Sequence, residues 1–321
     1  MLKQVTIVSP TQRTAHAATM ISAIGTPLDS AETLHQEGLD THIADQWANG
    51  INGLLVAGSM GAMQLLRDET YEALVRRSVE LSRGKGEVLV GCGECSSART
   101  RRRIEFLNTQ KVDGVVVLAP YFFTFGQQEL SDYYTDLADA SRAPLYLYDL
   151  PQRTHCKIEL PTALALSKHP NIRGIKCSDE PTYSRDLRDA LDAEGGDQRK
   201  FRIVIAQSGL VDVFIRGGFS EHVDGMFGIA PRWSVEIARC AHRGEWEAAS
   251  EFQRRLSALR NLVVRYGVLP AMTAMLNARG IPGNYAPRPM RPLNDAAREG
   301  LLAEPVVKDF LAAADPATAV S

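Results

Sequence analysis

Eight short apolar runs recur along the chain at intervals of roughly 30 residues, and this repetition limits the fold more than any other feature of the sequence. Several runs are almost continuously apolar, which is typical of strands buried on both faces. Longer stretches with helical periodicity separate them. The runs are MISAIG (20–25), GLLVAG (53–58), EVLVGC (87–92), GVVVLAP (114–120), PLYLYDL (144–150), IRGIKC (172–177), RIVIAQ (202–207) and DGMFGIA (224–230).

Strands that alternate with helices pair in parallel through right-handed crossovers. Eight is the number that closes a (β/α)8 TIM barrel, so we predict this α/β fold; a doubly wound open sheet is the alternative. Strand signals stop after about residue 232, and residues 233–316 show helical periodicity. We therefore predict an N-terminal arm (1–17), a barrel (18–232) and a C-terminal helical region (233–321).

The charge balance argues against a polyanionic partner. The chain has 36 basic and 38 acidic residues, a net charge of −2, so no basic field favours nucleic acid or an anionic membrane. Five cysteines, an odd number, fit a reducing compartment better than a disulfide scaffold. No signal-peptide pattern and no apolar stretch near the roughly 20 residues of a membrane helix is present. We expect a soluble, cytoplasmic protein.

In a TIM barrel the active site lies at the carboxyl ends of the strands. Lys176 ends one predicted strand, and Tyr148 ends the strand before it. Burial in a cavity there would disfavour the ammonium form of the lysine and make a neutral amine available, which attacks carbonyls to form a Schiff base. Two plainer interpretations stay open: Lys176 could extend to solvent, and Tyr148 could be an ordinary aromatic strand residue.

A glycine-rich turn, Gly58-Ser59-Met60-Gly61, follows another predicted strand. Its glycines would let the backbone approach a ligand, and its N–H groups could point at an anion, for which a carboxylate is the natural guest. The alternative is a tight turn that uses glycine for geometry alone.

Other motifs do not indicate a metal or a cofactor. Cys92 and Cys95 form one CxxC pair, which could suggest zinc or redox chemistry, but no second pair accompanies it. The glycine-rich turns lack both GxGxxG and the P-loop lysine. We expect no metal site and no nucleotide cofactor.

Three ordered motifs give the chain a family resemblance. The turn at 58–61, the segment YDLPQRT at 148–154 and the segment GIK at 174–176 resemble the signatures of the dihydrodipicolinate synthase/N-acetylneuraminate lyase family of pyruvate-dependent class I aldolases. In that family the turn reads Gly-[Ser/Thr]-Thr-Gly-Glu, the tyrosine segment reads Tyr-Asn-x-Pro, and the lysine follows the tyrosine by 28 residues. Here 176 − 148 is also 28.

The resemblance implies a TIM barrel with C-terminal helices, and a homotetramer. It implies that Lys176 forms the Schiff base with a 2-oxo acid and that Tyr148 moves protons to and from the substrate. The Ser59 hydroxyl, with backbone N–H groups of the turn from Gly58 to Met60, would hold the carboxylate of the 2-oxo acid.

The chain departs from the family pattern at several positions. Met60 replaces a threonine or serine, Ala62 replaces the common glutamate, and Asp149 replaces asparagine. Phe122 stands where the synthases carry a tyrosine that reaches the neighbouring subunit's site, which argues against true dihydrodipicolinate synthase activity. Arg153 matches the synthase arginine that meets a second carboxylate, which sialic acid lyases usually lack.

These features predict a Schiff-base lyase or aldolase that acts on a small 2-oxo acid. A dehydratase or deaminase of a 2-keto-3-deoxy acid, or a synthase-like condensation, would use the same residues. A non-catalytic barrel that binds a metabolite is the alternative from another class. The second substrate stays open, because the loops that select it vary freely on this fold.

Overall fold

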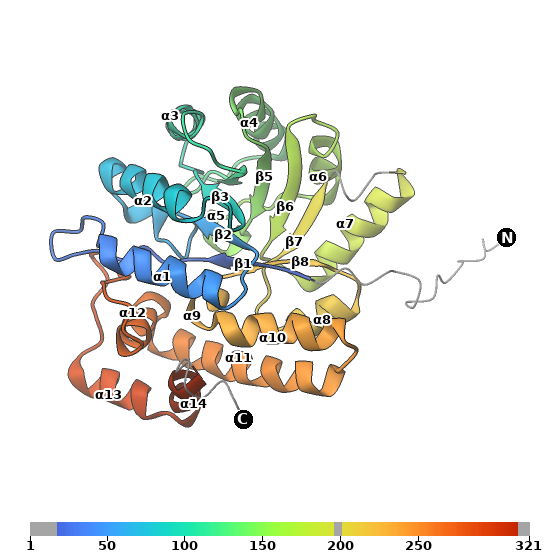
Figure 1. Ribbon diagram of the computed structural model, residues 1–321. Helices are drawn as coiled ribbons and strands as arrows, with labels where there is room; N and C mark the ends of the chain where they lie inside the picture. Colours follow the sequence, from blue (N-terminus) through green and yellow to red (C-terminus); the bar gives the residue numbers. More distant parts are fainter. Residues whose placement is uncertain (1–17, 196–200, 314–321) are drawn as a thin grey trace.

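The computed structural model describes residues 18–195 and 201–313, and it shows a closed barrel of eight parallel strands in sequence order (Figure 1). This confirms the predicted TIM barrel and excludes the open sheet. The predicted arm (1–17) lies outside the described residues. The strands are β1 (Thr19–Ala23), β2 (Gly53–Val56), β3 (Glu87–Gly91), β4 (Gly114–Leu118), β5 (Leu145–Asp149), β6 (Ile172–Cys177), β7 (Arg202–Ile205) and β8 (Glu221–Asp224).

The last strand differs from the prediction. The run at 224–230 is not a strand: β8 ends at Asp224, and the apolar residues after it form a short buried helix, α9 (Gly225–Ile229). The Asp224 carboxylate begins this helix by accepting a hydrogen bond from the Met226 N–H at 2.8 Å. A short, continuous apolar run does not distinguish a buried strand from a buried helix, which explains the error.

Helices surround the barrel and continue past it. Those that follow the strands are α1 (Gln36–Ala48), α2 (Asp68–Leu81), α3 (Ser97–Leu107), α4 (Gln127–Ala140), α6 (Leu160–Leu166), α7 (Pro181–Ala193) and α8 (Val211–Arg216). Two short elements, η2 (Met63–Leu65) and α5 (Pro151–Thr154), lie in the loops after β2 and β5.

The C-terminal helices lie together on the flank of the barrel near α1 and α9 (Figure 1). They are α10 (Pro231–His242), α11 (Trp246–Tyr266), α12 (Val268–Ala278), α13 (Asp295–Ala303) and α14 (Pro305–Ala313). Because α10 packs against β1, α8 and α9, it also covers the outside of the barrel. The predicted C-terminal helices are therefore confirmed, while the boundary at residue 232 stays a prediction. Within the described ranges, no helix combines the length and apolar character needed to cross a membrane.

A charged cluster closes the amino-terminal end of the barrel below the apolar interior. Arg202 at the start of β7 donates to Glu87 of β3 at 2.8 and 2.9 Å and to Glu221 of β8 at 2.7 Å. The same guanidinium donates to the Tyr146 hydroxyl at 3.0 Å. One arginine thus pairs with two half-buried carboxylates that come from separate strands.

We predict that Arg202→Met lowers the free energy of unfolding by about 3 kcal/mol, because Glu87 and Glu221 would be left without a counter-charge. Urea unfolding measures the change. The control is Arg298→Met, which breaks an exposed pair with Asp295 on α13 and should change stability by less than about 0.5 kcal/mol. Equal effects of the two substitutions would contradict this account of the barrel floor.

Candidate active site

Lys176 and Tyr148 meet inside the carboxyl end of the barrel. They are register partners on the neighbouring strands β6 and β5, so both side chains point to the same face. Lys176 is 7% exposed and Tyr148 is 4% exposed, so the lysine is buried rather than extended to solvent. Its Nζ lies 3.6 Å from the centroid of the tyrosine ring. The strand register alone is enough to place an amine and a phenol side by side.

The glycine-rich turn after β2 adds a hydroxyl to this pair. The Oγ of Ser59 lies 3.0 Å from the Tyr148 hydroxyl, close enough for a hydrogen bond. The loop after β1 holds this turn, because Thr26 Oγ1 donates to the Gly61 carbonyl at 2.7 Å. A Cβ on Gly61 would lie 3.1 Å from the Cα of Ala57, so a larger residue here would crowd the neighbouring backbone. Ser59 itself is exposed at the barrel mouth.

Met60, the next residue of the turn, supplies an apolar wall. Its side chain is partly buried and packs on the apolar interior of the barrel. It also lies against Gly225 at the start of α9, where an added Cβ would come within 2.7 Å of the Met60 sulfur. A thioether offers no strong hydrogen-bond donor, so only Ser59 brings a side-chain hydroxyl to this turn.

Ser178 is a site residue that the sequence reasoning missed. The Lys176 amine donates to its Oγ at 2.8 Å. Its own N–H donates to the Asp149 carbonyl at 3.1 Å, which continues the β5–β6 ladder beyond the strand ends. The signal was present in the sequence, because residues two apart on a strand share a face, and Ser178 follows Lys176 by two.

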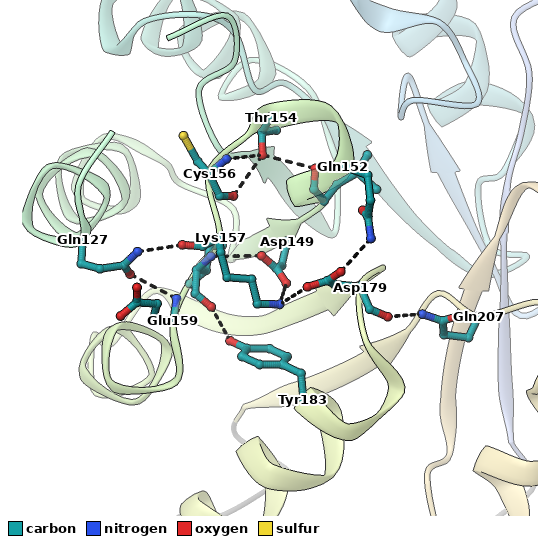
Figure 2. Close-up of polar contacts among 12 residues, drawn as sticks. Gln127, Asp149, Gln152, Thr154, Cys156, Lys157, Glu159, Asp179, Tyr183 and Gln207 are labelled. Atoms are coloured by element: carbon teal, nitrogen blue, oxygen red, sulfur yellow. Dashed lines mark hydrogen bonds and ion pairs between the residues drawn. The ribbon is translucent and has the colours of Figure 1, made fainter. Parts of the chain in front are cut away.

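Behind β5, on the face away from the barrel interior, Asp149 forms a buried ion pair with Lys157 (Figure 2). The carboxylate is fully buried and accepts the Ile158 N–H at 3.1 Å. Burial raises the pKa of Asp149, against the opposing effect of the Lys157 ammonium. Burial would by itself lower the pKa of Lys157, but its two carboxylate partners, Asp149 and Asp179, raise it. The ion pair occupies the position where the family pattern has a neutral asparagine.

Arg153 lies on α5, directly after β5, and is exposed. Within the described ranges its guanidinium has no ion pair, and no hydrogen bond joins it to Lys176 or Tyr148. The structure therefore places this predicted residue on a loop at the carboxyl end of the barrel, outside the buried cluster. Phe122, on the loop after β4, is 81% exposed.

The two cysteines of the CxxC pair differ in burial. Cys92 is buried, which raises the pKa of its thiol to about 12, while Cys95 is half-buried. A buried, protonated thiol is a poor metal ligand. The described part of the chain contains no cluster of three or more histidine, cysteine or acidic side chains arranged to hold a metal.

Comparison with known sequences gives a consistent family assignment. Residues 16–304 match the dihydrodipicolinate synthetase family. A 4-hydroxy-tetrahydrodipicolinate synthase from Xanthomonas campestris is 29% identical, with 86% of this chain and 90% of that protein aligned. An N-acetylneuraminate lyase from Rhizobium meliloti is 27% identical over the same shares of the two chains.

Solved structures share the fold. A dihydrodipicolinate synthase from Acinetobacter baumannii, chloride-inhibited and complexed with pyruvate, superposes with a TM-score of 0.83 at 21% identity. The alignment covers 92% of this chain and 99% of that one. The Thermotoga maritima dihydrodipicolinate synthase gives a TM-score of 0.82 at 23% identity, over 93% and 99% of the two chains.

Proposed function

We propose that Lys176 forms the imine with a 2-oxo acid. The premise is that this chain belongs to the dihydrodipicolinate synthetase family of pyruvate-dependent Schiff-base lyases and aldolases. The observation that carries the proposal is the buried contact of Lys176 with Tyr148, which in turn reaches Ser59. An amine, a phenol and a hydroxyl that lie next to one another in space are the groups that imine chemistry needs.

The first step is attack of the neutral Lys176 amine on the C2 carbonyl of the 2-oxo acid. A C–N bond forms, and the carbonyl oxygen takes a proton from the Tyr148 hydroxyl to give a carbinolamine. The nitrogen then gives up one proton, which Tyr148 passes to the same oxygen. The C–O bond breaks, water leaves, and the protonated imine and the Tyr148 phenolate remain. The protonated imine is an electron sink, which stabilises the carbanion left when the C3–C4 bond breaks. As the C3–C4 bond breaks, the Tyr148 phenolate takes the proton of the C4 hydroxyl, so that C4 leaves as a carbonyl. Tyr148 then delivers this proton to C3, and water hydrolyses the imine to release the 2-oxo acid and the Lys176 amine.

The turn from Gly58 to Met60 is proposed to hold the carboxylate of the 2-oxo acid. The Ser59 hydroxyl is exposed at the mouth and adjacent to Tyr148, and backbone N–H groups of a tight turn suit an anion. Met60 contributes its backbone and an apolar wall, but no second hydroxyl.

The proposed substrate carries a second acidic group at its distal end. Arg153 is exposed, has no ion pair in the described residues, and projects from the loop that follows Tyr148 in the chain. A guanidinium fork pairs with a carboxylate through two hydrogen bonds. Because Phe122 lacks the hydroxyl of the synthase tyrosine, we favour a lyase or aldolase over a dihydrodipicolinate synthase.

Two related proposals remain. Dehydration or deamination of a 2-keto-3-deoxy acid would start from the same imine and differ in which group leaves. We also retain a homotetramer and a cytoplasmic location, both suggested by the family rather than by the contacts within one chain.

We predict that borohydride reduction traps pyruvate on the peptide that contains Lys176. Lys176→Ala should abolish both the adduct and turnover, and Lys176→Arg should not restore them, because a guanidinium stays protonated. Mass spectrometry of the digested protein measures the adduct. Trapping that persists in Lys176→Ala would refute the assignment.

Tyr148→Phe removes one hydroxyl and very little volume. We expect imine formation to continue more slowly and kcat to fall by roughly 10²- to 10⁴-fold, the range for a lost general acid–base group. Steady-state kinetics with the best 2-oxo acid found in a screen measures the loss. An unchanged kcat would mean that water or another group moves the proton.

For Arg153→Ala we expect a KM about 10-fold or more higher for 2-oxo acids with a second carboxylate, since a charge-assisted contact is lost. Pyruvate trapping at Lys176 should be unaffected. The matched control is Arg173→Ala, because Arg173 is an exposed arginine near the start of β6, at the other end of the barrel. If Arg153→Ala abolishes pyruvate trapping in a folded protein, the assignment of separate carboxylate sites is wrong.

A further inference from the structure

Lys157 joins two loops that leave the barrel at neighbouring strand ends (Figure 2). Its Nζ contacts the Asp149 carboxylate at the end of β5 and lies 2.8 Å from Asp179 Oδ2, just beyond β6. The ammonium also lies 3.7 Å from the centroid of the Tyr183 ring on α7. The Tyr183 hydroxyl in turn donates to the Ile158 carbonyl at 2.8 Å, which holds the backbone next to Lys157.

Asp179, on the loop after β6, accepts hydrogen bonds from the loops on both sides of its own. Besides Lys157, the Gln152 side chain on α5 donates to its Oδ1 at 2.7 Å. The Gln207 side chain, just after β7, donates to its backbone carbonyl. Figure 2 shows these contacts converging from separate parts of the chain. Asp179 therefore ties the loops after β5, β6 and β7 to one another.

Ser178 lies between the end of β6, which carries Lys176, and Asp179. Its Oγ accepts a hydrogen bond from the Lys176 amine at 2.8 Å. Its backbone N–H donates to the carbonyl of Asp149. Ser178 is therefore hydrogen-bonded to the backbone of Asp149 and adjoins Asp179 in the chain. Lys157 pairs with the carboxylates of both residues. A shift of either flanking residue would move the Ser178 hydroxyl relative to the lysine.

Burial makes this cluster stiffer than a surface ion pair. The side chain of Lys157 is 30% exposed, that of Asp179 is 18% exposed, and that of Asp149 is fully buried. An exposed pair is worth little because water competes for both charges, whereas loss of one partner from a buried cluster leaves an uncompensated charge. The cluster has one ammonium for two carboxylates, so Lys157 is its only counter-charge among the described side chains in contact with them.

We propose that Lys157 is a positioning residue which, through Asp179 and the adjoining Ser178, sets the Ser178 hydroxyl against the Lys176 amine. This proposal rests on the proposed imine role of Lys176. Lys157 lies on the outer face of the strands and does not touch the reacting atoms. Its effect on imine formation is geometric, because an attacking amine must be held within a fraction of an ångström of its path.

The test compares rates of imine formation, measured by stopping mixtures of the full chain and pyruvate with borohydride at fixed times. Asp179→Asn should slow trapping by about 10-fold or more, since misplacement by about 1 Å can cost 100-fold. Lys157→Met should slow it similarly. Asp179→Asn keeps the ion pair of Lys157 with the buried Asp149 carboxylate, so we expect this variant to fold. It therefore still tests the proposal if Lys157→Met does not fold.

A double-mutant cycle identifies the route. Ser178→Ala should itself slow trapping, and adding Asp179→Asn to it should cost no more than about twofold further, because the residue through which Asp179 acts is already gone. The matched control is Lys168→Met, which removes a lysine from an exposed pair with Glu194, 3.1 Å away, and should leave the rate unchanged.

Hydrogen exchange supplies a readout independent of pyruvate. Asp179→Asn should increase exchange in segments 149–158 and 177–183, whereas Lys168→Met should not. Two results would overturn the positioning role while leaving the imine role of Lys176 in place. One is that Asp179→Asn traps pyruvate at the unaltered rate. The other is that the rate loss in the double variant equals the product of the losses in Ser178→Ala and Asp179→Asn. The absence of any adduct in the unaltered protein would instead overturn the proposed function, and the positioning role with it.

Discussion

The parallel pairing of β5 with β6 puts Tyr148 directly beside Lys176, and the rest of the site is arranged around that contact. Because successive strand residues alternate between faces, the same register that turns these two side chains inward turns Asp149 and Cys177 outward. The inner face carries the proposed chemistry, and the outer face carries the ion pair with Lys157. A slip of one residue would exchange the two faces and destroy both.

Burial of polar groups gives the site its order. At the top of the apolar barrel interior, Lys176 donates to Ser178, and the Tyr148 hydroxyl lies within hydrogen-bond distance of Ser59. At the opposite end, Arg202 balances Glu87 and Glu221. Both clusters join strands through polar groups, so the barrel is held at its two ends by polar contacts and in its middle by apolar packing.

The sequence predicts the groups that strand position determines. Lys176 and Tyr148 could be located because each ends an apolar run, and Ser59 because glycines mark its turn. The run at 224–230 was wrongly predicted to be a strand, because composition alone does not distinguish a buried helix from a buried strand. Lys157 could not be predicted, because its partners Asp149 and Asp179 come together only when two loops fold onto one another.

Two lysines lie close to the proposed site, and we assign them opposite roles. Lys176 is buried beside a phenol and a serine hydroxyl, whereas Lys157 is paired with two carboxylates that favour its charged form. The most direct measurement is peptide mapping of the unaltered protein after reduction of its pyruvate complex with borodeuteride. The account predicts one labelled lysine, Lys176, and no label on Lys157. Label on Lys157, or label spread over several lysines with Lys176 unmodified, would contradict it.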